Sequence, residues 1–229
     1  MIKLMMKKVI RVDELLANNY GEKAFKPGPD PLTELVLTVL SQNTNDNNRD
    51  KAFKSMKGLF PRWTDVLMTT PAKLAGAIKV GGLAKIKSAR IMKLLKAIKD
   101  THGELSLDFL NEWPDNDVRE YLLKIDGVGP KTAACMMAFA LGREVMPVDT
   151  HVHRVATRLG IIPPKMTAES AHGYFLDFKD AVSLYQLHLN LIAHGRQVCR
   201  ARNPQCAKCD LKRLCKYYAG QAKKQDAAA

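Results

Sequence analysis

The chain has 229 residues and a formal net charge of +13, with 36 lysines and arginines against 23 aspartates and glutamates. This excess favours a polyanionic partner, either nucleic acid or an anionic membrane surface. No apolar run approaches the roughly 18 residues of a membrane span, and the N-terminus lacks the long apolar core of a signal peptide. We therefore expect a cytoplasmic protein with no membrane partner, nucleoid-associated in a prokaryote, and a monomer.

The N-terminal part predicts two helices and a polar loop. The first helix is expected around residues 8–19. A second begins at Asp30-Pro31, because aspartate caps a helix and proline suits its first position. Apolar residues at helical spacing continue it to Leu40. The eight polar residues 41–48 that follow are expected to form an exposed loop, either a functional one or a solvated connection.

Glycine and proline also delimit the helices that follow. Thr70-Pro71 starts a short helix, and Val80-Gly81-Gly82-Leu83 ends it. The next helix, over residues 86–98, carries several lysines, among them Lys87, on what we expect to be its solvated face. The lysines nearest the glycine pair could instead touch a phosphate. A further helix is predicted to begin at Asp115.

A Gly-x-Gly turn separates two predicted helices, of which the second opens at Lys131. Gly127 and Gly129 allow positive φ and a close approach to a ligand, and the free N–H groups of the new helix point at an anion. A DNA phosphate is the expected anion, and a plain packing turn is the alternative. Asp149 follows Lys131 by 18 residues, and a lysine at a helix start with an aspartate nearby can act as an amine nucleophile.

The C-terminal part predicts more helices after Arg154. Thr167 can cap a helix whose apolar face includes Phe175 and Phe178. Residues 220–229 are expected to fray. The sequence shows no convincing alternating strand pattern and no long-period repeat. The predicted fold class is therefore all-α, with many short helices joined by short loops.

Four of the five cysteines gather near the C-terminal end, in the pattern Cys199-x6-Cys206-x2-Cys209-x5-Cys215. Four thiolates suit either zinc or a cubane iron–sulfur cluster, and their chemistry alone does not separate the two. A set of structural thiols without metal is the third alternative. A metal site here would hold down a basic loop that could lie along a DNA backbone. Cys135 stands apart and is expected to be a small core residue.

These features resemble one family, because four landmarks follow one another in that family's order. The landmarks are Gln42-Asn43-Thr44, the hairpin Gly127-Val128-Gly129-Pro130-Lys131-Thr132, the segment Val148-Asp149-Thr150-His151, and His194-Gly195-Arg196 before the cysteines. Over roughly residues 30–217 the chain resembles the helix-hairpin-helix base-excision DNA glycosylases, specifically the endonuclease III branch, whose iron–sulfur loop has this cysteine spacing. Asp126 departs from the family's usual proline. The Gln42 loop and the helix over residues 113–125 also look like the plant 5-methylcytosine glycosylases.

The resemblance implies a two-lobed all-α fold with a DNA-binding cleft between the lobes. One lobe is a six-helix barrel over about residues 31–143 that contains the helix-hairpin-helix motif. The other combines residues 1–30 with 144–229 and holds a [4Fe–4S] cluster on the four cysteines. Contacts with double-stranded DNA are expected from Gln42, Asn43, Gly127, Val128, Gly129, Thr132, His151 and Arg154.

The implied activity is that of a bifunctional DNA glycosylase and AP lyase in base excision repair, removing oxidised pyrimidines. Lys131 would attack C1′ to form a Schiff base that permits nicking by β-elimination, and Asp149 would stabilise positive charge on the sugar and shuttle protons. Gln42, or else Asn43, would fill the gap left by the flipped base. Alternatives are a glycosylase for mismatched thymine, 5-methylcytosine or oxidised guanine, a non-catalytic DNA-binding module, and a zinc-ribbon-like interaction protein.

Overall fold

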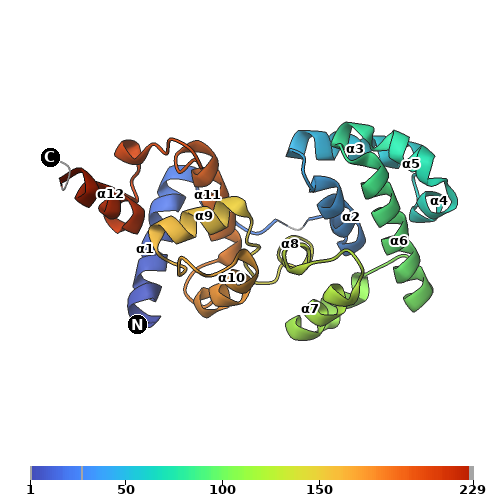
Figure 1. Cartoon of the computed structure of the whole chain (residues 1–229). Coiled ribbons are helices and arrows are strands. Elements are labelled where there is room, and N and C mark those ends of the chain that lie inside the picture. The colour runs from blue at the N-terminus through green and yellow to red at the C-terminus, as the bar shows by residue number, and fades with distance from the viewer. Residues whose placement is uncertain (1, 27, 227–229) are drawn as a thin grey trace. The chain divides into compact units, whose positions relative to one another are not determined.

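A computed structural model describes residues 2–26 and 28–226, and every regular element within these ranges is helical (Figure 1). The predicted all-α fold class is therefore confirmed. None of the described helices is long and apolar enough to cross a membrane. The α-helices are α1 (Ile2–Tyr20), α2 (Pro31–Ser41), α3 (Asp46–Leu59), α4 (Trp63–Met68), α5 (Pro71–Ala77), α6 (Ala84–His102), α7 (Asp115–Lys124), α8 (Pro130–Phe139), α9 (Thr150–Leu159), α10 (Ala168–Tyr174), α11 (Leu184–Gln197) and α12 (Lys216–Asp226). Short 3-10 helices are η1 (Lys79–Gly81), η2 (Asp108–Glu112), η3 (Phe175–Phe178), η4 (Cys206–Lys208) and η5 (Lys212–Leu214).

The chain divides into two compact units. One joins Met1–Lys26 to Glu144–Ala229, and the other is Pro27–Arg143. We call them the terminal unit and the central unit. The description of these parts as a six-helix barrel over residues 31–143 and a cluster-binding lobe over residues 1–30 and 144–229 stays a prediction.

Helix α2 forms the middle of the central unit and packs against α3, α6 and α8. It begins where the sequence predicts, because the Asp30 side chain accepts a hydrogen bond of 2.9 Å from the backbone N–H of Thr33. Its apolar stripe, including Leu35 and Val36, is fully buried. Burial of each such side chain stabilises the fold by about 1.5–3 kcal/mol, which fixes α2 as the support for the loop that follows it.

Only part of the polar stretch after α2 is a loop. Asn45 caps α3, and its side chain accepts a hydrogen bond of 2.9 Å from the backbone N–H of Asn48. The expectation that residues 41–48 are all loop is wrong, because short polar side chains satisfy the first N–H groups of a helix and so start one. The connection between α2 and α3 consists only of Gln42–Asn45. Gln42 therefore lies in a short loop that a helix holds at each end.

One lysine of α6 is buried, so the expectation of a solvated lysine face is wrong at this position. Lys87 is 1% exposed, and its Nζ donates to the carbonyls of Leu40 at 2.8 Å and Gly81 at 2.7 Å. Helical periodicity alone could not reveal this, since the C-terminus of α2 and the turn at η1 supply the two acceptors. Burial lowers the pKa of Lys87.

We expect Lys87→Met to lower the free energy of unfolding by about 2–4 kcal/mol, because two buried carbonyls lose their charged donor. Urea denaturation followed by circular dichroism measures the change. Lys85→Met is the matched control, since Lys85 is exposed on the same helix and should shift stability by no more than about 0.5 kcal/mol. Equal midpoints for the two variants would contradict a structural role for the Lys87 ammonium group.

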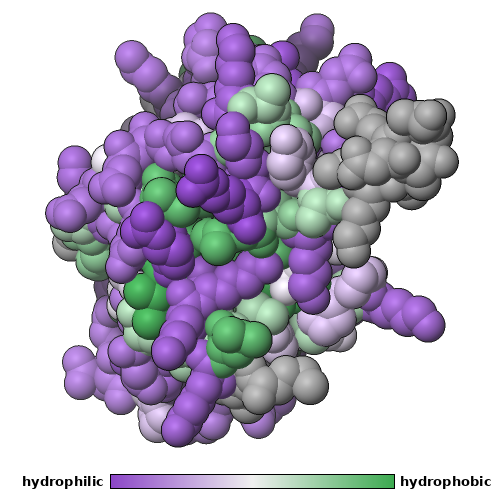
Figure 2. Space-filling view, turned by 90° about the vertical axis from the view of Figure 1, so that its left-hand side faces the viewer, coloured by the Kyte–Doolittle hydropathy of each residue, from purple (hydrophilic) through white to green (hydrophobic). Residues whose placement is uncertain are grey.

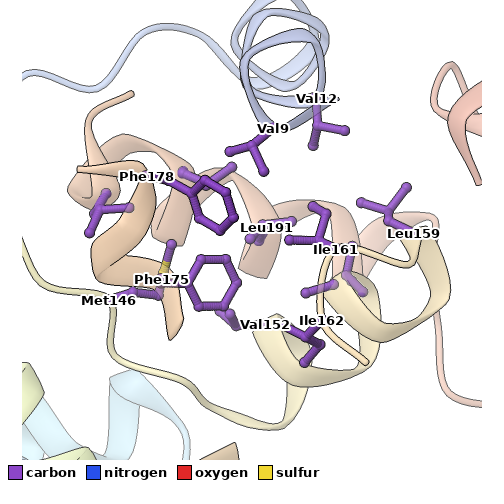
Figure 3. Packing of buried hydrophobic residues seen from close by; sticks show 14 of the residues in the cluster. Val9, Val12, Met146, Val152, Leu159, Ile161, Ile162, Phe175, Phe178 and Leu191 are labelled. Carbon is purple, nitrogen blue, oxygen red and sulfur yellow. The ribbon is translucent and has the colours of Figure 1, made fainter. Parts of the chain in front are cut away.

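The terminal unit has its own core, formed where α1, α9 and α11 pack together (Figure 1). Figure 3 shows Phe175 and Phe178 pointing toward one another between Val9 of α1 and Val152 of α9, with ring centroids 6.2 Å apart. Thr167 caps α10 as predicted, by accepting a hydrogen bond from the backbone N–H of Ser170. This core holds α9 and α11, from which the candidate site of this unit is built.

The C-terminal end is helical further than expected. The prediction that residues 220–229 fray is wrong for residues 220–226, which belong to α12, while residues 227–229 lie outside the described residues. Helix α12 packs against α9, and the Arg158 guanidinium lies over the Tyr217 ring at 4.7 Å. The face of the molecule in Figure 2 is mostly hydrophilic, as the charge of the chain predicts.

Candidate functional site

The predicted hairpin lies in the central unit between α7 and α8. Gly127 has φ of 83°, which favours glycine at this position. Val128 is buried, and its N–H bonds to the carbonyl of Ile125 at 3.0 Å. Helix α8 opens at Pro130, one residue before the predicted start, and its N-cap Gly129 provides no side-chain cap. The first N–H groups of α8 therefore lack the partner that serine or aspartate would supply, which suits an anion.

Lys131 occupies the second position of α8 and is exposed. The next residue, Thr132, is buried. The start of α8 therefore points Thr132 into the core and Lys131 to the surface. The exposed Lys131 side chain thus leaves α8 in its first turn, at the positive end of the helix dipole.

Glu34 of α2 is a polar residue near Lys131 that sequence reasoning missed. Burial raises the pKa of the Glu34 carboxyl, and attraction to Arg49, a hydrogen bond from Thr38 and attraction to Lys131 all oppose that rise. The Thr38 hydroxyl donates to Glu34 Oε1 at 3.4 Å. A glutamate in the first turn of an otherwise apolar helix was the available signal, and the packing of α2 on α8 gives it meaning.

The Gln42 loop is held at both its backbone and its side chain. Gln42 N–H bonds to the carbonyl of Val39 at 3.3 Å, and its Oε1 accepts a hydrogen bond of 2.6 Å from Arg90 Nη1. The next residue, Asn43, is exposed and has φ of 51°, a conformation that asparagine tolerates better than most residues. Spacing in the sequence does not predict the contact of Gln42 with Arg90, which lies 48 residues away on α6.

Asp126 stands where the family usually has proline, directly before Gly127 of the hairpin turn. Its carboxylate forms an ion pair with Lys93 of α6. The hydrogen bond and the attraction from Lys93 lower the pKa of Asp126, and attraction from Arg90 adds to this effect. Helix α6 therefore contacts the hairpin turn through Lys93 and the Gln42 loop through Arg90.

Asp149 lies in the terminal unit as the N-cap of α9. Its Oδ1 accepts a hydrogen bond of 2.7 Å from the backbone N–H of Val152. The sequence contains the signal for a helix cap, because Asp149 directly precedes an amphipathic helix. The prediction considered Asp149 only as a catalytic carboxylate. The cap orients the carboxylate and uses one oxygen, so the second oxygen is not needed for the helix.

Two histidines hold the backbone that leads into Asp149. His188 of α11 lies 2.8 Å from the carbonyl of Pro147 through its Nδ1. His172 Nδ1 lies 2.9 Å from the carbonyl of Met146 and 3.3 Å from the N–H of Val148. In one tautomer Nδ1 of His172 donates to the carbonyl of Met146, and in the other it accepts a hydrogen bond from the N–H of Val148. The segment before Asp149 is thereby tied to α10 and α11.

Arg154 joins α9 to the segment that precedes the cysteine loop. Its Nη2 donates to the carbonyl of Gly195 at 2.9 Å, and its Nε donates to the carbonyl of Cys199 at 3.0 Å. His151 lies 3.1 Å from the same guanidinium. A Cβ at Gly195 would come within 3.1 Å of both side chains, so a larger residue here would push against Arg154 and His151. Arg154 has this structural contact whether or not it also meets DNA.

The four predicted metal-binding cysteines line one pocket of the terminal unit, together with His194 and Arg158. Arg158 Nη1 donates to Cys199 Sγ at 3.4 Å, and Cys209 Sγ lies 3.6 Å from His194 Nε2. Burial raises the pKa of Cys209 to about 11 and also raises that of Cys206. Burial therefore disfavours the thiolate form of Cys206 and Cys209 in the free protein.

Four thiols around one pocket form a donor set that suits an iron–sulfur cluster or a zinc ion. In the described part of the chain, no three histidine, cysteine or acidic side chains are placed to hold one metal ion. Zinc needs four sulfurs at about 2.3 Å from one point. A cubane cluster instead binds each thiolate on a different iron.

A family model described as the HhH-GPD superfamily of base excision DNA repair proteins matches residues 36–176. The chain therefore belongs to the HhH-GPD superfamily of base excision DNA repair proteins. Its similarity to endonuclease III proteins places it in the endonuclease III branch, as the sequence landmarks predicted.

Individual relatives support this placement. Endonuclease III of Thermotoga maritima is 30% identical over 194 residues, which cover 85% of this chain and 86% of that protein. A candidate DNA glycosylase of Arabidopsis thaliana is 38% identical over 167 residues, which cover 72% of this chain but only 56% of that protein. A solved structure of a trapped endonuclease III–DNA covalent intermediate matches with a TM-score of 0.79 and 25% identity, over 95% of this chain and 98% of that one.

Proposed function

We propose that the protein is a DNA glycosylase and AP lyase of base excision repair that removes oxidised pyrimidines from double-stranded DNA. The observation that carries this proposal is the exposed amine of Lys131 at the second position of α8, in a hairpin whose opening N–H groups have no side-chain cap. A purely hydrolytic relative would have no amine here. The match to endonuclease III over most of both chains supports the same class.

In the proposed mechanism the hairpin N–H groups bind a phosphate while the damaged nucleotide is flipped out of the stack. Gln42 fills the vacated position. The Lys131 amine attacks C1′, its new bond to carbon replaces the glycosidic bond, and the resulting Schiff base allows β-elimination. Asp149, fixed by its cap to α9, stabilises the positive charge that develops on the sugar and moves protons.

We further propose that Cys199, Cys206, Cys209 and Cys215 hold a [4Fe–4S] cluster. Bound there, the cluster would supply a cross-link that fixes the loop between the first and last cysteine, and it would keep the four thiols deprotonated. That loop carries Arg200, Arg202, Lys208 and Lys212. The ordered loop would therefore present positive charge to a DNA backbone.

Cysteine replacement tests the cluster independently of activity. Anaerobically purified protein is expected to be brown, with broad absorbance near ~400 nm and about four iron atoms per chain. Cys206→Ala should lose the iron and the absorbance. Cys135→Ala is the matched control and should keep both, because Cys135 is buried in α8 of the central unit. Colourless protein with bound zinc would contradict the proposal.

Borohydride trapping on a duplex that carries thymine glycol tests the activity and the substrate together. A covalent protein–DNA adduct supports the lysine mechanism on an oxidised pyrimidine. An adduct only with a ready-made abasic site would keep the lyase and move the substrate to mismatched thymine, 5-methylcytosine or oxidised guanine. Failure on both duplexes would favour a non-catalytic DNA-binding module.

A further inference from the structure

His194, in the landmark that precedes the cysteine loop, contacts two of the four cysteines. Its backbone carbonyl accepts a hydrogen bond of 2.8 Å from the N–H of Cys199, and its ring Nε2 lies 3.6 Å from Cys209 Sγ. The residue is only 4% exposed, so the ring bonds to protein groups rather than to solvent. The proposed lyase mechanism gives this buried ring no role.

Tyr20, the last residue of α1, contacts the other nitrogen of the His194 ring. The Tyr20 hydroxyl lies 3.0 Å from His194 Nδ1, and the two rings meet edge to face with centroids 6.0 Å apart. Helix α1 packs against α11 in the core of the terminal unit, which holds the hydroxyl in place. The imidazole thus has a hydroxyl group at one ring nitrogen and a sulfur atom at the other.

The two contacts together define which nitrogen of His194 carries the hydrogen. A cysteine that binds iron is a thiolate, so its sulfur accepts hydrogen bonds and has no hydrogen to donate. His194 Nε2 must then donate to Cys209 Sγ. Burial favours the neutral imidazole, which has a single N–H, so Nδ1 is an acceptor. The Tyr20 hydroxyl donates to Nδ1 and thereby stabilises the tautomer that Cys209 requires.

We propose that Tyr20 and His194 form a hydrogen-bond relay to Cys209 Sγ that raises the reduction potential of the bound [4Fe–4S] cluster. This inference rests on the proposed function, since it takes the four cysteines to hold that cluster. Hydrogen bonds to the sulfurs help to set the potential of such a cluster. A donor on a thiolate stabilises negative charge, so it favours the form that has gained one electron. Tyr20 is a positioning residue, because it acts only through the tautomer and orientation of His194.

Voltammetry of the cluster-containing protein on an electrode tests the relay without DNA or catalysis, because the electrode supplies the electron and all four thiolates stay bound. His194→Leu removes the donor and should change the equilibrium constant of the couple by about tenfold, as expected for one hydrogen bond to a charged group. The potential then falls by about 59 mV for one electron. Tyr20→Phe should lower it by a smaller amount. His194→Gln keeps an N–H donor and should stay closer to wild type.

Tyr174→Phe is the matched control, since it removes a hydroxyl from a ring that packs against Phe178, and it should leave the potential unchanged. Iron content and absorbance near ~400 nm verify that each variant holds the cluster. If His194→Leu loses its iron, Tyr20→Phe decides alone. A Tyr20→Phe protein with the wild-type potential would overturn the relay while the cluster assignment stands. Wild-type protein that binds zinc in place of iron would refute the cluster and the relay together.

Discussion

Lys131→Ala should reduce strand nicking at an abasic site by about 10³-fold or more, because no other group supplies the amine that forms the Schiff base. Binding to the same duplex should survive at both low and high salt, because the groups proposed to bind a phosphate are backbone N–H groups of the hairpin, which the substitution leaves in place. The variant should fold, since Lys131 is exposed at the start of α8 and alanine is the best helix former. Single-turnover nicking and binding titrations at two salt concentrations measure both effects.

The control for this result is a second lysine of the same hairpin. Lys124 is exposed at the end of α7, so Lys124→Ala removes equal charge without touching the proposed nucleophile. Its nicking rate should stay within a few-fold of wild type. Nicking preserved in pure Lys131→Ala protein would refute the assignment of the nucleophile.

Asp149→Asn should lower the single-turnover rate by about 10²–10⁴-fold, the usual contribution of a positioned acid–base group. Folding should be unaffected, because asparagine caps a helix as well as aspartate does and can accept the same hydrogen bond from the N–H of Val152. The substitution therefore removes charge and keeps the cap. An unchanged rate in Asp149→Asn would refute a role in the chemistry.

Asp149→Ala completes the comparison by removing the cap as well. It should be as inactive as Asp149→Asn but less stable by about 1 kcal/mol, the usual cost of losing a helix cap. Thermal unfolding of the two variants measures the difference. Two variants with equal stability would show that the cap contributes nothing to the fold, and the loss of rate could then be assigned to the charge alone.

Local chemistry explains which parts of the fold were predictable. Asp30 and Thr167 cap helices because their own side chains reach the next turn, so neighbouring residues suffice to predict them. The burial of Lys87 depends on carbonyls at residues 40 and 81, which only the packed structure brings together. The α12 helix likewise depends on packing against α9, a contact that composition does not reveal.

The residues of the candidate site also fall into two groups, those that sequence patterns predict and those that only the folded structure reveals. Short sequence motifs contain the hairpin with Lys131, the segment with Asp149 and the four cysteines, so these residues could be predicted from the sequence. Arg90 and Glu34 act through contacts between helices that are distant in the chain, and no spacing rule connects Arg90 to a loop 48 residues earlier. Both residues come near the candidate site only because α2 packs against α6 and α8.

Peptide mapping of the borohydride-trapped adduct tests the central claim most directly. Wild-type protein is trapped on an abasic duplex, the DNA is digested to a sugar remnant, and tandem mass spectrometry locates the modified amine. The account predicts the remnant on Lys131 at the start of α8. A remnant on another lysine or on the N-terminal amine, with Lys131 unmodified, would contradict it.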